Sequence, residues 1–219
     1  MIDEDSSKEE VLASVKQHWY TYRYASKTLQ NDEDIVYAIV EQRGMALNLF
    51  SEDLRKNKKI VLAAVKHNGL ALKYASKDLQ NDPGIVLAAV MKDGTALGVA
   101  SENLRKNKKI VLAAVMKNGI ALKYASEDLR NDSDIVLAAV ERYGMALEYA
   151  SKDLRNNKKI VLAAVNQNFQ AFKYALEELQ KNEQVKNVVL AKRKQHENLQ
   201  QKVSDVTLQL IKLPGYAVD

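Results

Sequence analysis

The sequence repeats itself every 25 residues, and this period restricts the possible folds more than any other feature. The pair Ile-Val, or its equivalent, recurs at residues 35, 60, 85, 110, 135 and 160. Five copies carry the identical run Val-Leu-Ala-Ala-Val, which starts at Val61, Val86, Val111, Val136 and Val161. A fixed period of this length is typical of stacked structural units.

The repeats divide into seven units, because Val11–Val15 and Val36–Val40 are close variants of the same run. We place the units near residues 7–31, 32–56, 57–81, 82–106, 107–131, 132–156 and 157–182. Residues 51–82 and 101–132 match at 26 of 32 positions, so a second period of 50 residues lies on top of the first. Residues 1–182 therefore form one repeat domain, followed by a C-terminal segment, 183–219.

Residues that begin and end helices flank each apolar run. A side chain that can accept a hydrogen bond from free backbone N–H groups precedes the runs. These expected N-caps are Asp32, Asn57, Asp82, Asn107, Asp132, Asn157 and Asn182. A glycine follows most runs, where helices often end in a left-handed conformation: Gly44, Gly69, Gly94, Gly119 and Gly144. Together with the paired alanines, these signals favour a helix over a buried strand.

The expected fold is an all-α solenoid of seven helical hairpins. A helix of about ten residues is roughly 15 Å long and only marginally stable alone, so it must be packed between neighbours. A second short helix is expected after each glycine, as at Ala71–Ser76. A last turn, opened by a recurrent serine, would then carry a leucine inward, as at Ser76 and Leu79.

Both ends of the array depart from the pattern. Trp19 and Phe169 stand where the other units have glycine, and such large apolar groups are expected to close the ends. Beyond Asn182 the sequence predicts one long helix, Glu183–Lys212, ended by Pro214 and Gly215. We prefer a helix that covers the last hairpin; self-association or partner binding through residues 183–212 is the alternative.

Composition excludes several classes of protein. The 219 residues include 33 Lys and Arg against 28 Asp and Glu, a formal net charge of +5 that does not by itself indicate nucleic-acid binding. The chain has no cysteine, which excludes disulfides, Cys-ligated metals and a thiol nucleophile. It has no apolar stretch of about 18 residues, so we expect no transmembrane segment and a cytoplasmic protein.

No catalytic motif is present. The three histidines, His18, His67 and His196, lie in polar stretches without a second ligand at metal-binding spacing, so we expect them on the surface. The recurrent serines indicate helix caps, because a catalytic residue needs one unique environment. We therefore expect a protein that is not an enzyme and needs no cofactor or metal.

Residues 107–132 carry the signature Asn-x-x-Ile-Val-Leu-Ala-Ala-Val-x-x-x-Gly-x-Ala-Leu-x-Tyr-Ala-Ser-x-x-Leu-Arg-Asn-Asp. This signature resembles the helical repeats of the family called domain of unknown function 4116, and the resemblance covers residues 7 to about 182. No common activity is assigned to that family. Its occurrence in intracellular bacteria and protists implies a translocated effector or adaptor that acts in a host cell.

The turns between units alternate in charge. Acidic turns include Asp82 and Asp132, whereas basic turns carry paired lysines. We prefer a structural role, in which acidic and basic turns attract each other across each interface. The alternative is a ladder that binds phosphate groups of nucleic acid or anionic lipid. Its residues would be Lys58, Lys59, Lys108, Lys109, Lys158 and Lys159.

A candidate partner-binding site lies where two adjacent units place methionine at a position that is polar elsewhere, at Met91 and Met116. The fourth unit also has Gly98 and Val99 in place of Lys-Tyr. The missing tyrosine, between Tyr74 and Tyr124, is expected to leave a shallow apolar groove for a partner's side chain. Drift in a tolerant repeat, or a self-association patch, is the alternative.

The resulting functional hypothesis is a non-enzymatic scaffold that binds another protein. Two alternatives stay open: a phosphate-binding module that uses the lysine turns, and a regulatory domain of a larger enzyme system.

Overall fold

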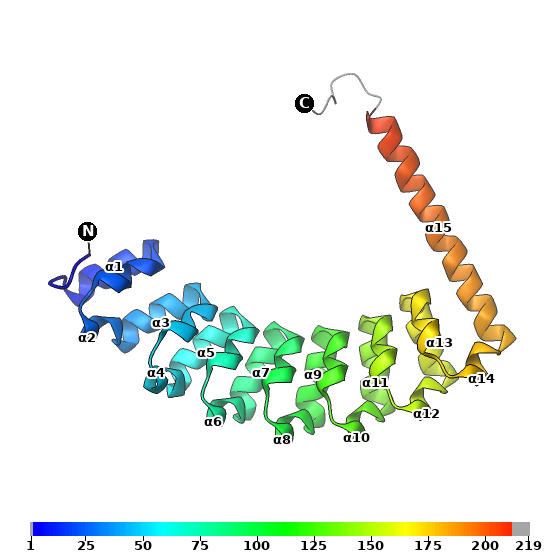
Figure 1. The fold of residues 1–219 in the computed structure, drawn as a ribbon, viewed down its shortest axis with the longest axis horizontal. Helices are drawn as coiled ribbons and strands as arrows, with labels where there is room; N and C mark the ends of the chain where they lie inside the picture. Colours follow the sequence, from blue (N-terminus) through cyan, green and yellow to red (C-terminus); the bar gives the residue numbers. More distant parts are fainter. Residues whose placement is uncertain (1, 212–219) are drawn as a thin grey trace.

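The structure, a computed structural model, describes residues 2–211. Its regular elements in this range are all helices, and they form one curved row of units (Figure 1). The all-α solenoid predicted from the repeats is therefore confirmed. Among residues 2–211, no helix has both the length and the apolar character needed to cross a membrane.

Each unit contains three helices, one more than the predicted hairpin. In the third unit, α5 (Lys58–His67) is a ten-residue α-helix, η3 (Gly69–Tyr74) is a 3₁₀ helix, and α6 (Lys77–Gln80) is a short α-helix. Ala75 and Ser76 have extended backbones and separate the last two. The return stretch is thus a 3₁₀ helix that begins at the glycine itself.

The same three elements recur along the chain. The other long helices are α1 (Lys8–Gln17), α3 (Glu33–Gln42), α7 (Pro83–Lys92), α9 (Lys108–Lys117), α11 (Ser133–Arg142) and α13 (Lys158–Gln167). The other 3₁₀ helices are η1 (Trp19–Tyr24), η2 (Gly44–Leu49), η4 (Gly94–Val99), η5 (Gly119–Tyr124), η6 (Gly144–Tyr149) and η7 (Phe169–Tyr174). The other short helices are α2 (Lys27–Gln30), α4 (Glu52–Lys56), α8 (Glu102–Arg105), α10 (Glu127–Arg130), α12 (Lys152–Arg155) and α14 (Glu177–Gln180).

The predicted N-caps are confirmed. Asp82 accepts hydrogen bonds from the N–H groups of Gly84 and Ile85, and Pro83 occupies the first position of α7. The equivalent side chains of Asp32, Asn57, Asn107, Asp132, Asn157 and Asn182 accept in the same way. Since these caps satisfy N–H groups that a helix leaves free, they fix where each long helix starts.

The core runs through the whole row. In α5 the side chains of Ile60, Val61, Ala64 and Val65 are at most 1% exposed. Each long helix packs against the long helices of the neighbouring units. Each 3₁₀ helix packs against the next long helix, and η2 to η6 also pack against the next 3₁₀ helix. Contacts therefore join successive units, as expected for a stacked array.

The short helices form the convex edge of the row (Figure 1). Backbone hydrogen bonds link them from unit to unit: Ser101 N–H donates to the Gln80 carbonyl at 3.1 Å, and Ser126 N–H donates to the Arg105 carbonyl at 3.1 Å. Equivalent bonds join Ser76 to Arg55, Ser151 to Arg130 and Leu176 to Arg155. These bonds satisfy main-chain groups and fix the spacing along this edge.

The prediction that the recurrent glycines are left-handed helix ends is wrong. None of them has a positive φ. A Cβ atom at Gly44 would instead lie 2.2 Å from the carbonyl oxygen of Ala64 in the next unit. The same approach, at 2.3 to 2.4 Å, occurs at Gly69, Gly94, Gly119 and Gly144. Glycine is needed here because two backbones come too close for any side chain.

The last helix, α15 (Glu183–Ile211), leaves the row and projects away from it (Figure 1). Val185 is buried against the repeats, but residues 193–207 are exposed. We had expected the whole helix to cover the last unit. Only its first turns do so. Lys212, Pro214 and Gly215, which were expected to end the helix, lie outside the described residues.

Candidate functional site

Each long helix has one side that reaches the surface at its ends. In α5 this side consists of Lys59, Leu62, Ala63 and Lys66, spaced i, i+3, i+4 and i+7 as one side of a helix requires. The two lysines are exposed, Leu62 is half-buried and Ala63 is buried. We call the same four positions in α3 to α13 the long-helix face. Its members are Asp34, Tyr37, Ala38, Glu41, Lys59, Leu62, Ala63, Lys66, Gly84, Leu87, Ala88, Met91, Lys109, Leu112, Ala113, Met116, Asp134, Leu137, Ala138, Glu141, Lys159, Leu162, Ala163 and Asn166.

The centre of the long-helix face is apolar. Met91 on α7 is 63% exposed and Met116 on α9 is 62% exposed. One turn earlier, Leu87 and Leu112 are half-buried. The helices α7 and α9 pack side by side, so the two methionines lie on neighbouring helices whose axes are about 8–10 Å apart. Flexible, polarizable methionines suit a surface that adapts to a partner.

Charged side chains flank this centre on both sides. On α5, Lys59 and Lys66 line a groove of about 630 Å³ that reaches Lys92 on α7. The Lys59 ammonium lies 4.8 Å from the centre of the Tyr37 ring. A hydrogen bond with Glu41 raises the pKa of Tyr37 above its usual value.

On the other side of the methionines, α11 presents the exposed carboxylates Asp134 and Glu141. The methionine pair thus has a basic flank at α5 and an acidic flank at α11.

The other residues predicted for this site lie on the 3₁₀ helices. A Cβ at Gly98 would be 2.7 Å from Cε1 of Tyr124, so the Tyr124 ring packs directly over this glycine. Val99 and Tyr74 are half-buried and pack against the core. Met91 and Met116 therefore belong to a different row of helices from Gly98, Val99, Tyr74 and Tyr124.

Half of the lysines in the alternative anion-binding set make contacts between units. Lys58 pairs with Asp82 at 2.6 Å, and Lys108 pairs with Asp132 at 2.6 Å. Hydrogen bonds from these lysines are the main reason that the pKa values of both aspartates lie below the usual value. Lys158 donates a hydrogen bond to Gln184.

These ion pairs correct the expected charge pattern, which had acidic and basic turns attracting across each interface. Within residues 2–211, ion pairs between long-helix starts join α1 to α3, α5 to α7 and α9 to α11, but not the interfaces in between. The reason is local. A lysine at the first position of one helix reaches the capping aspartate of the next, whereas the intervening interfaces meet a neutral asparagine cap such as Asn107.

His67 has a structural role that the sequence did not indicate. Its Nδ1 accepts a hydrogen bond from the Gly44 N–H at 3.2 Å, although the side chain is exposed. At the equivalent position, Gln167 Oε1 accepts from the Gly144 N–H at 2.6 Å. Within residues 2–211, no group of three His, Asp or Glu side chains is arranged to hold a metal ion.

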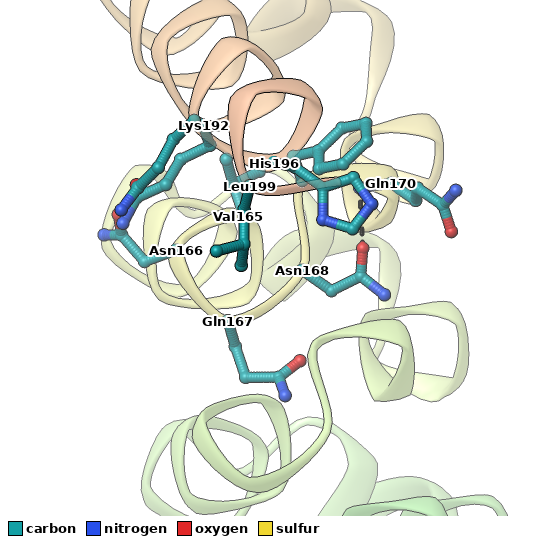
Figure 2. A pocket seen from close by; sticks show the side chains of 10 residues that line it. Val165, Asn166, Gln167, Asn168, Gln170, Lys192, His196 and Leu199 are labelled. Carbon is teal, nitrogen blue, oxygen red and sulfur yellow. Dashed lines mark hydrogen bonds between the residues drawn. The ribbon is translucent and has the colours of Figure 1, made fainter. Parts of the chain in front are cut away.

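A cleft between the last unit and α15 was also missed. It has a volume of about 490 Å³ and is lined by Val165, Phe169, His196 and Leu199 among polar amides (Figure 2). The His196 and Phe169 rings lie 5.6 Å apart. The cleft exists because α15 continues straight where the other long helices end, and Phe169 at the glycine position is the sequence signal for it. We call this space the terminal cleft.

A family model described as Domain of unknown function (DUF4116) matches residues 7–55, 57–105, 85–130, 107–155 and 132–180. Three of these matches begin 50 residues apart and each spans two units, in agreement with the 50-residue period. No curated protein and no solved structure matches the chain.

Proposed function

The chain belongs to the family described as domain of unknown function (DUF4116), and from this premise we propose that it is a non-enzymatic scaffold that binds a partner protein through the long-helix face. The observation that carries the proposal is the pair of exposed methionines, Met91 and Met116, on adjacent packed helices. Exposed apolar side chains that adjoin each other on a rigid surface are typical of protein-binding sites.

The charges around the methionines define the partner. Lys59 and Lys66 lie on one flank, and Asp134 and Glu141 lie on the other. A complementary partner is an amphipathic segment with apolar side chains over α7 and α9, acidic residues toward α5 and basic residues toward α11. Apolar contacts would supply affinity, and the charges would set the direction of the segment.

Repetition supports a role other than catalysis. The hydroxyls of Ser26, Ser76, Ser101 and Ser151 accept hydrogen bonds from backbone N–H groups at the starts of short helices. These four serines therefore have a capping role, whereas Ser51 and Ser126 make no such side-chain bond and Leu176 stands at this position in the last unit.

The test is binding of a captured partner to variants of the face. A partner retained from a host lysate at high salt is identified and titrated against the wild type and Met91→Lys/Met116→Lys. We expect at least about a tenfold loss of affinity, because two charges would enter an apolar contact. Asn166→Lys, which adds a charge at the equivalent position on α13, is the control and should bind as the wild type does. Unchanged affinity of the double variant, with helical circular dichroism intact, would contradict the proposal.

The proposal includes the setting that the family resemblance implies, an effector or adaptor acting in a host cell. A fusion to a reporter that is activated only in host cytosol tests this part. Signal in infected cells supports it. Absence of signal in infected cells, although the fusion is expressed in the producing cell, refutes it without affecting the scaffold proposal.

A phosphate-binding module is the second candidate, favoured by the groove at Lys59, Lys66 and Lys92. Binding of single-stranded RNA or anionic vesicles that falls steeply with salt, and falls further in Lys66→Glu, would favour this candidate. Lys58, Lys108 and Lys158 are engaged by Asp82, Asp132 and Gln184, which favours the scaffold over phosphate binding through these lysines.

A further inference from the structure

The methionines within the described residues divide into a half-buried pair and an exposed pair. The chain has five methionines and no cysteine, so thioether groups contain all of its sulfur. Met45 in η2 and Met145 in η6 are half-buried and pack against the core. Met91 on α7 and Met116 on α9 are 63% and 62% exposed. Met1 lies outside the described residues. Among residues 2–211, oxidants in solution therefore have open access to two sulfur atoms, which lie on adjacent helices.

Transfer of oxygen to a methionine sulfur makes the side chain polar and leaves the backbone unchanged. The thioether becomes a sulfoxide, which damages packing when the side chain lies in a core. The position of Met91 and Met116, however, is polar in neighbouring units, where Lys66, Glu141 and Asn166 occupy it. The fold therefore accepts a polar side chain at this position. Oxidation would remove the apolar character that sets this position of α7 and α9 apart.

We propose that Met91 and Met116 form a reversible oxidation site, at which a peroxide makes the apolar centre of the long-helix face polar. Each sulfur attacks one oxygen of hydrogen peroxide, the O–O bond breaks and an S–O bond forms. The sulfur gives up two electrons. The other oxygen leaves as water, after it takes up the proton that the transferred oxygen loses. Methionine sulfoxide reductases reverse the step: a dithiol supplies two electrons and becomes a disulfide, and the oxygen leaves as water.

The oxidation site itself is independent of the proposed function, but its effect on a partner rests on that function. A partner that covers both methionines would have to bury two sulfoxide groups, and an unpaired buried polar group weakens binding. Oxidation would thus release the partner. A bound partner would in turn protect the two sulfur atoms from peroxide, because effects of this kind are reciprocal.

Peptide mapping by mass spectrometry tests the site on the isolated protein. At partial conversion with hydrogen peroxide, Met91 and Met116 should form sulfoxide at least about threefold faster than Met45 and Met145, because they are more exposed. In denaturing urea the four rates should converge. The two stereospecific reductases with a dithiol should return the original mass, and helical circular dichroism should stay unchanged throughout. Equal rates in the folded protein, or loss of helicity when this pair is oxidised, would overturn the proposal.

Hydrophobic-interaction chromatography measures the change in the surface without a partner. The wild type should be retained less after oxidation, and reduction should restore its retention. Met91→Leu/Met116→Leu keeps the surface apolar but lacks both sulfur atoms, so peroxide should not change its retention. Met45→Leu/Met145→Leu is the matched control and should respond as the wild type does. Equal retention of the oxidised and reduced wild type would overturn the change in polarity.

Binding of a partner, once identified, separates this proposal from the proposed function. After peroxide is removed, the oxidised wild type should bind the partner at least about tenfold more weakly than the reduced wild type. Peroxide treatment of Met91→Leu/Met116→Leu should not change its affinity. A partner that binds oxidised and reduced wild type equally would refute the regulation. A partner that is insensitive to Met91→Lys/Met116→Lys contradicts the proposed function, whereas selective oxidation of this pair would still support the oxidation site.

Discussion

A missing Cβ atom sets the distance between neighbouring units. At Gly94 the backbone of η4 comes so close to α9 that a Cβ would lie 2.3 Å from the Ala114 carbonyl oxygen. Phe169 occupies this register in the last unit, and there the next helix diverges and leaves the terminal cleft. Glycine thus permits this close approach between successive units, and a large side chain stands at this position only in the first unit, Trp19, and in the last, Phe169.

Gly94→Ala should therefore destabilise the fold by about 1–3 kcal/mol, because a backbone carbonyl cannot move aside without separating two units. The matched control is Gly98→Ala in the same 3₁₀ helix. There the new methyl group meets only the Tyr124 ring, at the end of a side chain that can rotate, so the loss should be under about 1 kcal/mol. Urea unfolding of both variants measures the difference, and equal losses would contradict this role of Gly94.

For single residues, the sequence predicted the helix N-caps correctly but not the role of the recurrent glycines. A cap such as Asn107 is recognisable because an accepting side chain must directly precede a helix. A glycine after a helix has two explanations, a positive φ or a close approach, and only the position of the next unit decides between them. The hydrogen bond that the Gly44 N–H donates to His67 could not be predicted from the sequence either, because the two residues lie 23 positions apart.

The elements of a unit were predictable in proportion to their length. The ten-residue long helices follow from caps and an apolar run, and they are as expected. The 3₁₀ helices are six residues long, too short for periodicity to distinguish them from a turn of α-helix. Ion pairs form at every second interface between long helices. The charge pattern alone did not predict this alternation, because it does not show which lysine reaches the next helix.

The pairing of α5 with α7 can be tested without disturbing a cap. Asp82→Asn keeps a side chain that caps α7 as asparagine caps α5, but it removes the ion pair with Lys58. We expect a loss of about 0.2–1 kcal/mol at pH 7 and low salt, because the pair is partly exposed. Thermal unfolding at two salt concentrations checks the value, and the loss should shrink as salt screens the pair.

The pH dependence of this effect has a definite sign. The pKa of Asp82 in the folded protein is below its usual value, chiefly because Lys58 donates a hydrogen bond to it. Its contribution to stability is therefore present above the unfolded pKa, near 4, and is lost as the pH falls through the lower folded pKa. Wild type and Asp82→Asn should converge in stability as the pH falls below the folded pKa of Asp82. A difference that grows on acidification would contradict the ion pair.

For the whole molecule, sequential stacking was predictable and the shape was not. Units of marginal stability must cover one another, and the regular order of the repeats favours neighbours in sequence. The curvature of the row depends on how each unit is rotated against the next, which no local pattern in the sequence encodes. The predicted partner-binding site is split between two rows of helices, since Met91 lies on a long helix and Gly98 lies on a 3₁₀ helix.

The account depends on an extended row in which each unit contacts only its neighbours. Small-angle X-ray scattering of the protein as it elutes from a size-exclusion column measures this directly. Seven units at about 10 Å spacing, together with the projecting α15, predict a radius of gyration above about 22 Å. A compact 219-residue domain would give about 17 Å, and a value near that figure would contradict the stacked row.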